Sequence, residues 1–184
     1  MAKGEQAPVF IGKILAGGGG KHPAFLIFLM QEKQTVQSEM GRANEHMDEK
    51  NREVEAILEE RFGKDTLIAL ETAQGGIPYV RNVNAYYEGG AFYIITDARS
   101  NKMKHIGENP LVAIAGEWFT AQGRGEHLGF FGKEENDWIA QKLTAVFKAW
   151  LGNGHVNLAD ENTVILRVRL THGVLFSHGA RYEF

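Results

Sequence analysis

The chain has no cysteine among its 184 residues, which excludes disulfide bonds, thiolate zinc sites, iron–sulfur clusters and cysteine nucleophiles together. Proline is scarce, with 4 residues, whereas glycine is abundant, with 22. Many glycines with few prolines favour tight turns between strands over a disordered linker. The content of 43% hydrophobic and 23% charged residues is that of an ordinary globular domain, and it excludes disorder of the whole chain.

Charge and hydropathy do not indicate nucleic acid or membrane as a partner. Twenty basic and 23 acidic residues give a net charge of −3, so no broad attraction to nucleic acid or anionic lipid is expected. The longest apolar run, residues 24–30, is far shorter than the ~20 residues that a membrane-spanning helix needs. No compact basic segment precedes this run and no small-residue cleavage site follows it, so we expect a cytoplasmic protein.

Two regions differ in their patterns: an N-terminal extension over residues 1–45 and one domain over residues 46–184. Four consecutive glycines at 17–20 and the lack of a persistent period predict an extension that packs on the domain or on a partner subunit. From residue 45 to residue 62 the pattern becomes helical, with Val54, Ile57, Leu58 and Phe62 on one side. Gly63 is a suitable stop for this helix.

After Gly63 the pattern is typical of strands. Short apolar or β-branched segments predict strands over residues 66–72, 77–87, 91–96, 111–115, 118–128, 163–170 and 173–176. Helices are predicted over 100–107 and 134–151, and Gly123 with Gly125 indicates a bulge within the fifth strand. About six or seven antiparallel strands with flanking helices predict a mainly β fold, a closed or nearly closed barrel.

Several familiar catalytic and binding motifs are absent. The sequence has no G-x-S-x-G elbow, no P-loop and no H-E-x-x-H. His172 and His178 lie six residues apart across a predicted turn, which is not a convincing ligand spacing, so no metal site is expected. Gly123 and Gly125 match part of a dinucleotide fingerprint, but the parallel βαβ context that this motif requires is missing.

Polar residues interrupt the predicted strand over residues 77–87. Asn82 and Asn84 share one face of this strand, while Arg81 and Val83 share the other, because side chains alternate. Asparagine amides can donate and accept hydrogen bonds, as recognition of a planar heterocycle requires. A solvated strand face explains the same residues when they are taken alone.

A second polar group follows the third strand. Ser100 occupies the N-cap position of the next helix and Lys102 lies in its first turn, so backbone N–H groups, a hydroxyl and an ammonium converge, as a phosphate site requires. An ordinary cap with an exposed lysine is the alternative. The apolar strand end Ile94-Ile95-Thr96 lies directly before this turn, where a flat ring could rest. A ligand with a polar ring at one end and a phosphate at the other, such as FMN, fits these features together.

The same region also carries a more specific pattern, T-x3-S-x-K-x3-I-x2-N-P, from Thr96 to Pro110. With Arg81-Asn82-Val83, Tyr87 and Phe92-Tyr93, it resembles the flavin-binding core of pyridoxamine 5′-phosphate oxidase and its relatives, the FMN-binding split-barrel superfamily. The resemblance extends from residue 45 to about residue 176 and does not include the N-terminal extension.

The resemblance implies a set of cofactor contacts. Arg81, Ser100, Asn101 and Lys102 would contact the FMN phosphate. Asn82, Val83 and Asn84 would meet the pyrimidine edge of the ring, and Ile95 and Thr96 would line the same cofactor. Members of the superfamily are homodimers with FMN at the subunit interface, so the resemblance implies a homodimer here.

Departures from the oxidase change the expected activity. Tyr86 replaces the lysine that closes the first flavin strand of the oxidase, and Trp118 replaces a glutamine that reaches the flavin. Residues 171–184 hold no equivalent of the oxidase's arginine–histidine substrate motif. We therefore expect an FMN-dependent oxidoreductase of unknown substrate that is related to pyridoxamine phosphate oxidase without sharing its reaction.

Other functions are compatible with the same sequence. The chain could hold flavin or haem for storage or sensing without turnover, because a fold does not determine a function. It could also be a barrel whose site has decayed while its dimer is retained. No catalytic side chain can be named from the sequence, and the purpose of the extension is not indicated.

Overall fold

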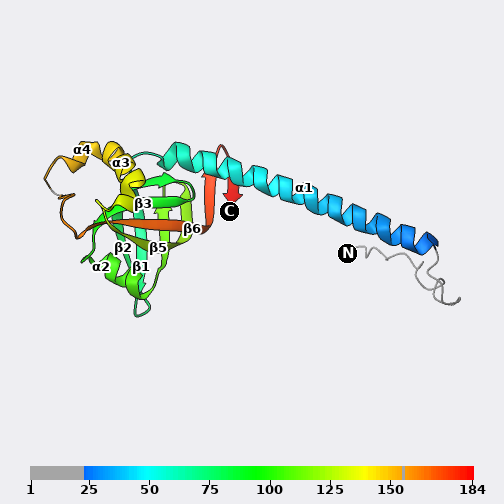
Figure 1. Cartoon of the computed structure of the whole chain (residues 1–184), viewed down its shortest axis with the longest axis horizontal. Helices are drawn as coiled ribbons and strands as arrows, with labels where there is room; N and C mark the ends of the chain where they lie inside the picture. The colour runs from blue at the N-terminus through cyan, green and yellow to red at the C-terminus, as the bar shows by residue number, and fades with distance from the viewer. Residues whose placement is uncertain (1–22, 155) are drawn as a thin grey trace. The chain divides into compact units, whose positions relative to one another are not determined.

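A computed structural model of the chain describes residues 23–154 and 156–184 (Figure 1). The chain divides into two compact units, Met1–Met47 and Asp48–Phe184. A single helix, α1 (Pro23–Phe62), contributes to both units.

Helix α1 begins at Pro23, well before the start near residue 45 that the apolar spacing predicted. Residues 24–40 contain neither glycine nor proline and are rich in the good helix formers Gln, Glu, Lys and Met. Pro23 suits the first position of a helix, where its missing N–H is not needed.

The second unit is built mainly from β-strands. These are β1 (Thr66–Gln74), β2 (Ile77–Glu88), β3 (Ala91–Asp97), β4 (Leu111–Gly116), β5 (Phe119–Phe130), β6 (Thr163–Ser177) and β7 (Ala180–Glu183). The helices are α2 (Asn101–Glu108), the 3₁₀ turn η2 (Glu134–Asn136), α3 (Asp137–Val146) and α4 (Lys148–Leu151).

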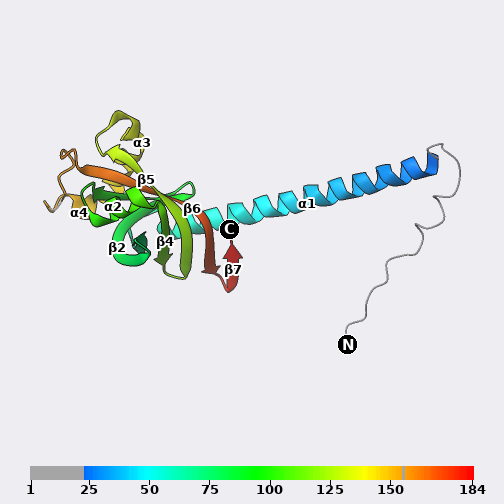
Figure 2. The same ribbon diagram turned by 90° about the horizontal axis from the view of Figure 1, so that it is seen from below.

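All strand pairs are antiparallel, and six of the strands close into a barrel (Figures 1 and 2). The strand order is β3-β2-β1-β4-β5-β6-β7, and β3 also pairs with β6, from Ala91↔Arg169 to Asp97↔Thr163. Strand β7 pairs with β6 outside the barrel. The expected mainly β, split-barrel fold is confirmed.

Three local details differ from the expectations. The two strands predicted over 163–170 and 173–176 form one strand, β6, whose first half pairs with β3 and whose last residues pair with β7. The predicted helix over 134–151 is divided at Phe147, whose side chain is fully buried. Trp118 lies in the turn before β5, with φ 54°, and not within the strand. The expected bulge is present, as a register shift between Gln122 and Gly123.

Two hydrophobic clusters lie on opposite faces of β3 because its side chains alternate. Phe92 and Ile94 point into the barrel interior, where Phe92 contacts Phe62 of α1 with ring centroids 5.6 Å apart. Tyr93 belongs to the outer cluster, which packs against Leu143 of α3.

The barrel is split between β2 and β3. These strands pair only over Tyr86–Glu88 and Ala91–Tyr93. The remainder of β2 pairs with β1, and the remainder of β3 pairs with β6. Within the described residues, the first part of β2 and the last part of β3 therefore leave strand edges without a partner strand.

Candidate functional site

The unpaired edges of β2 and β3 are the segments that the sequence analysis selected. Residues 82–84 lie on β2 before its pairing with β3 begins, and Ile95 and Thr96 lie on β3 after that pairing ends. Strand edges present backbone N–H and C=O groups that are free to bind another molecule. Residues 82–84 pair with β1 on their other side, so their exposed edge can offer donors and acceptors to a heterocycle.

Hydroxyl groups hold two cations at this end of the barrel. Arg81 lies on the inner face of β2, and its Nη1 donates to Thr72 Oγ1 at 2.7 Å and to the Leu70 carbonyl oxygen at 3.2 Å. The Nζ of Lys102 donates to Thr96 Oγ1 at 2.7 Å and to Ser100 Oγ at 3.4 Å.

The two cations interact with each other. Burial lowers the pKa of Lys102 below its ordinary value, the positive charge of Arg81 lowers it further, and Asp97 opposes both effects. Burial also lowers the pKa of Arg81, against an opposing effect of Glu71. Like charges that share a partly desolvated region destabilise one another unless an anion lies between them.

The nearest candidate counter-ion, Asp97, is bound elsewhere. Its Oδ2 accepts a hydrogen bond from Arg99 Nη2 at 2.6 Å, and the bonds from Arg99 lower the pKa of Asp97 to about 2. In residues 23–154 and 156–184, neither Arg81 nor Lys102 forms an ion pair with a carboxylate. The cluster therefore has the charge and donors of an anion site.

The start of α2 adds to this positive character. Ser100 is the N-cap residue, as predicted, with extended φ and ψ of −64° and 153°. Its side chain makes no capping hydrogen bond, so the hydroxyl remains available to a ligand. The N–H groups of the first helical turn carry the positive end of the helix dipole, which favours an anion.

A buried pair of residues stands behind Arg81. The side chain of Thr72 is fully buried, and its Oγ1 lies 2.9 Å from Nδ1 of His105, which is 3% exposed. The ring of His105 contacts Tyr79, with centroids 4.7 Å apart. Since Thr72 Oγ1 accepts from Arg81, its hydroxyl hydrogen is free to be donated to Nδ1 of His105. Thr72 and His105 fix the position of the guanidinium, and sequence reasoning did not identify either residue.

The structure separates some predicted site residues from this cluster. The side chain of Val83 is 9% exposed and faces the core, so only its backbone can reach a ligand. The amide of Asn84 donates to Asp65 Oδ1 at 2.8 Å. Ile95 packs against the outer cluster, whereas the side chains of Asn82 and Asn101 are exposed. The cluster itself contains Arg81, Thr96, Ser100 and Lys102.

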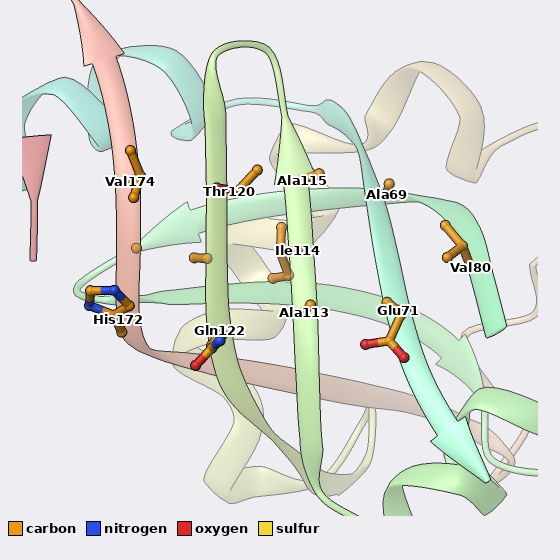
Figure 3. A pocket seen from close by; sticks show the side chains of 12 residues that line it. Ala69, Glu71, Val80, Ala113, Ile114, Ala115, Thr120, Gln122, His172 and Val174 are labelled. Carbon is orange, nitrogen blue, oxygen red and sulfur yellow. The ribbon is translucent and has the colours of Figure 1, made fainter. Parts of the chain in front are cut away.

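A second feature is a concave surface of about 470 Å³ on the outer face of β1, β4, β5 and β6 (Figure 3). Small side chains, including Ala69, Ala113 and Ala115, line its floor. The strand register aligns three polar side chains across it in one row, Glu71, Gln122 and His172, as Figure 3 shows.

This row was missed by the sequence analysis. Trp118, which was predicted to replace the flavin-contacting glutamine of the oxidase, lies in a turn and is 68% exposed, whereas Gln122 is the β5 amide that lines the concavity. Alternation along the strand could have predicted this position, because it places Gln122 on the same face of β5 as Thr120, which also lines the concavity.

Large apolar side chains are exposed on the sheet face that carries the concavity, and Val80 is among the residues that line it. Those exposed on this outer face or in the adjoining turn are Leu67, Val80, Leu111, Trp118 and Phe176. Large apolar side chains exposed on one face in this way are typical of an interface with another molecule.

The described residues contain no cluster of metal ligands and no membrane-spanning helix. No group of three or more His, Asp or Glu side chains lies close enough together there to hold a metal ion. Over residues 23–154 and 156–184, no helix has an apolar stretch of the length needed to span a bilayer.

Comparisons with known proteins identify the fold. No protein-family model and no curated protein matches the sequence. The structure is similar to an FAD-binding protein from Mesorhizobium loti, with a TM-score of 0.50 and 16% identity over 61% of this chain and 86% of the other. It is also similar to a provisionally assigned pyridoxamine 5′-phosphate oxidase from Listeria innocua. The TM-score is 0.50 and the sequence identity is 15%, over 70% of this chain and 98% of the other. For a NimC/NimA family protein from Clostridium acetobutylicum, the TM-score is 0.50 and the sequence identity is 18%, over 71% of this chain and 92% of the other. At these identities the similarity establishes the split-barrel fold.

Proposed function

We propose that this protein binds FMN between the parted strands β2 and β3 and acts as an FMN-dependent oxidoreductase. The observation that carries the proposal is the pair of cations, Arg81 and Lys102, held by hydroxyls and without a carboxylate partner in the described residues. The names of the similar structures, one an FAD-binding protein and one an assigned pyridoxamine phosphate oxidase, support a flavin in this fold.

The anionic end of the cofactor fits the cation cluster. Arg81 and Lys102 would contact the phosphate as charged donors, while Ser100 and the first N–H groups of α2 would add hydrogen bonds. A dianionic phosphate between the two cations would oppose the burial and the charge of Arg81, which together lower the pKa of Lys102.

The ring would lie along the edge of β2. Backbone groups of residues 82–84 can hydrogen-bond the polar edge of an isoalloxazine, and the amide of Asn82 is exposed beside them. When bound, the flavin supplies hydride or electron transfer, and the chain binds it, orients it and excludes water from one face. The absence of a recognisable nucleophile in the sequence is consistent with this division of roles.

A homodimer with the cofactor at its interface completes the proposal. The outer face that carries the concavity exposes Leu67, Val80 and Phe176 and offers apolar surface for a second copy. Glu71, Gln122 and His172 would then lie within a shared pocket and supply polar contacts to a substrate or to the partner.

The first test is the absorption spectrum of the purified protein followed by an FMN titration. Flavin bands, or their appearance on titration, are expected. A charge-assisted hydrogen bond contributes roughly 1.5–3 kcal/mol, so Lys102→Ala should weaken FMN binding by about 10- to 100-fold. Lys104→Ala is the matched control, because Lys104 is an exposed lysine on the same helix. Equal affinity of the Lys102 and Lys104 variants would reject the phosphate role.

A titration with riboflavin tests recognition of the phosphate directly. Riboflavin should bind much more weakly than FMN to the natural chain and about equally to the natural chain and Lys102→Ala. Equal binding of FMN and riboflavin to the natural chain would show that the phosphate is not recognised.

Turnover distinguishes an enzyme from a storage protein. Reduction of the bound flavin by NADH or NADPH, followed by reoxidation with an added acceptor, supports the oxidoreductase. A flavin that no donor reduces would instead support storage or sensing. A Soret band in place of flavin bands would identify haem and overturn the proposal.

A further inference from the structure

Helix α1 carries a stripe of residues that repeats every seven positions. One row of the stripe contains Lys33, Met40, Met47 and Val54, and the second contains Val36, Ala43, Lys50 and Ile57. The two rows alternate at spacings of three and four residues, which is the a and d pattern of a coiled coil. Rows of this kind lie on one face of a helix.

The two ends of this stripe differ in burial. Val54 and Ile57 are 2% and 7% exposed, since they pack in the hydrophobic core of the barrel unit. Val36, Met40 and Met47 are 55%, 62% and 59% exposed. The N-terminal part of α1 therefore carries large apolar side chains that are more than half exposed.

A helical segment of this kind requires a partner. Helices without tertiary contacts are marginally stable in water, because helical stability in proteins comes mostly from packing of an apolar face. We propose that the α1 segment over residues 30–47 pairs with the same segment of a second copy of this chain as a parallel two-stranded coiled coil.

Charge around the stripe favours a second copy over a membrane surface. Residues 30–50 contain five acidic and three basic residues, whereas helices that lie on membranes are rich in Lys and Arg. Lys33 occupies an a position and Glu32 the preceding g position. In a parallel pair, Lys33 lies beside Glu32 of the partner subunit, and a single lysine at an a position fixes register.

The absence of cysteine from the natural chain permits a sharp test. In a parallel, in-register pair each a residue faces its own copy within the Cα separation that a disulfide requires. Full-length single-cysteine variants Met40→Cys and Met47→Cys, oxidised mildly and run on a non-reducing gel, should therefore lose their monomer band. Ser38→Cys is the control, because Ser38 is exposed at an f position on the opposite side of the helix.

Each outcome has a defined meaning. Retention of the monomer band in Met40→Cys and Met47→Cys at the level of Ser38→Cys overturns the proposal. Cross-linking at only one of the two methionine positions indicates an antiparallel or shifted pair and also overturns it. Circular dichroism checks that each variant is folded. The cross-links should persist in a Lys102→Ala background, in which FMN binding is weakened, and in the absence of added FMN, so the result is independent of the proposed function.

Discussion

Replacement of Thr72 by valine tests how the protein positions Arg81 for the phosphate. The substitution preserves the shape of a fully buried side chain but removes the oxygen that accepts from Arg81 at 2.7 Å and lies 2.9 Å from His105 Nδ1. Arg81 then keeps only its 3.2 Å bond to the Leu70 carbonyl oxygen.

Two effects of different size are expected. A buried group left without its hydrogen bond costs about 1–3 kcal/mol, so the loss of the partner of His105 should lower the free energy of unfolding by that amount. Ordering a freed arginine on binding costs about 0.5–1.5 kcal/mol, which converts to roughly a 2- to 10-fold weaker FMN affinity. Riboflavin affinity should not change, because riboflavin lacks the phosphate.

Chemical denaturation and parallel titrations with FMN and riboflavin measure both effects. Ser177→Ala is the matched control, because Ser177 is 4% exposed and its hydroxyl oxygen accepts a hydrogen bond from Arg61 Nη2 at 3.2 Å, at the end of β6 opposite to the end that pairs with Asp97. It should lower stability without altering FMN affinity. An unchanged FMN affinity in Thr72→Val, or an equal loss for FMN and riboflavin, would refute the positioning role.

Further predictions concern pH and packing. Because the pKa of Lys102 is lowered, the ratio of FMN to riboflavin affinity should fall as pH rises, with a midpoint below the ordinary lysine value of about 10.4, and Lys102→Ala should abolish this fall. The unfolded chain holds that proton more tightly, so the free energy of unfolding of the flavin-free protein should rise with pH over the same range; a flat denaturation profile would contradict this. Gly123→Ala should destabilise the barrel by about 1–3 kcal/mol, because a Cβ there would lie 2.6 Å from a backbone carbonyl oxygen of β6. Gly107→Ala, where a Cβ meets no atom within 4 Å, should instead be neutral or stabilising in the same denaturation assay.

Local patterns were sufficient to predict most of the barrel. Alternation along the strand predicted that Arg81 and Val83 lie on the face opposite Asn82. In the structure Val83 is buried and Asn82 is exposed, as this prediction requires. Glycine-rich turns and the cap at Ser100 marked where strands end and α2 begins. These signals are local, since they depend on neighbouring residues and on backbone geometry alone.

Contacts that depend on closure of the barrel were not predictable. Thr72 and His105 are 33 residues apart, and neither residue type indicates that one will face the other. Strand β6 was predicted in two pieces because the apolar alternation over residues 163–170 stops before the polar residues Thr171 and His172. Its halves pair with different strands, so their exposure changes along one continuous strand.

The cation cluster is better explained by binding than by stability. The ammonium of Lys102 is partly buried beside Arg81, and the carboxylate that could neutralise it is bound to Arg99. Removing a desolvated charge with a like-charged neighbour should stabilise a protein, whereas removing a ligand's partner should weaken binding. The apolar substitution Lys102→Met therefore should raise the free energy of unfolding of the flavin-free protein while it lowers FMN affinity. A higher free energy of unfolding together with a lower FMN affinity would identify Lys102 as a phosphate-binding lysine. If Lys102 instead supported the fold, the free energy of unfolding and the FMN affinity would both fall.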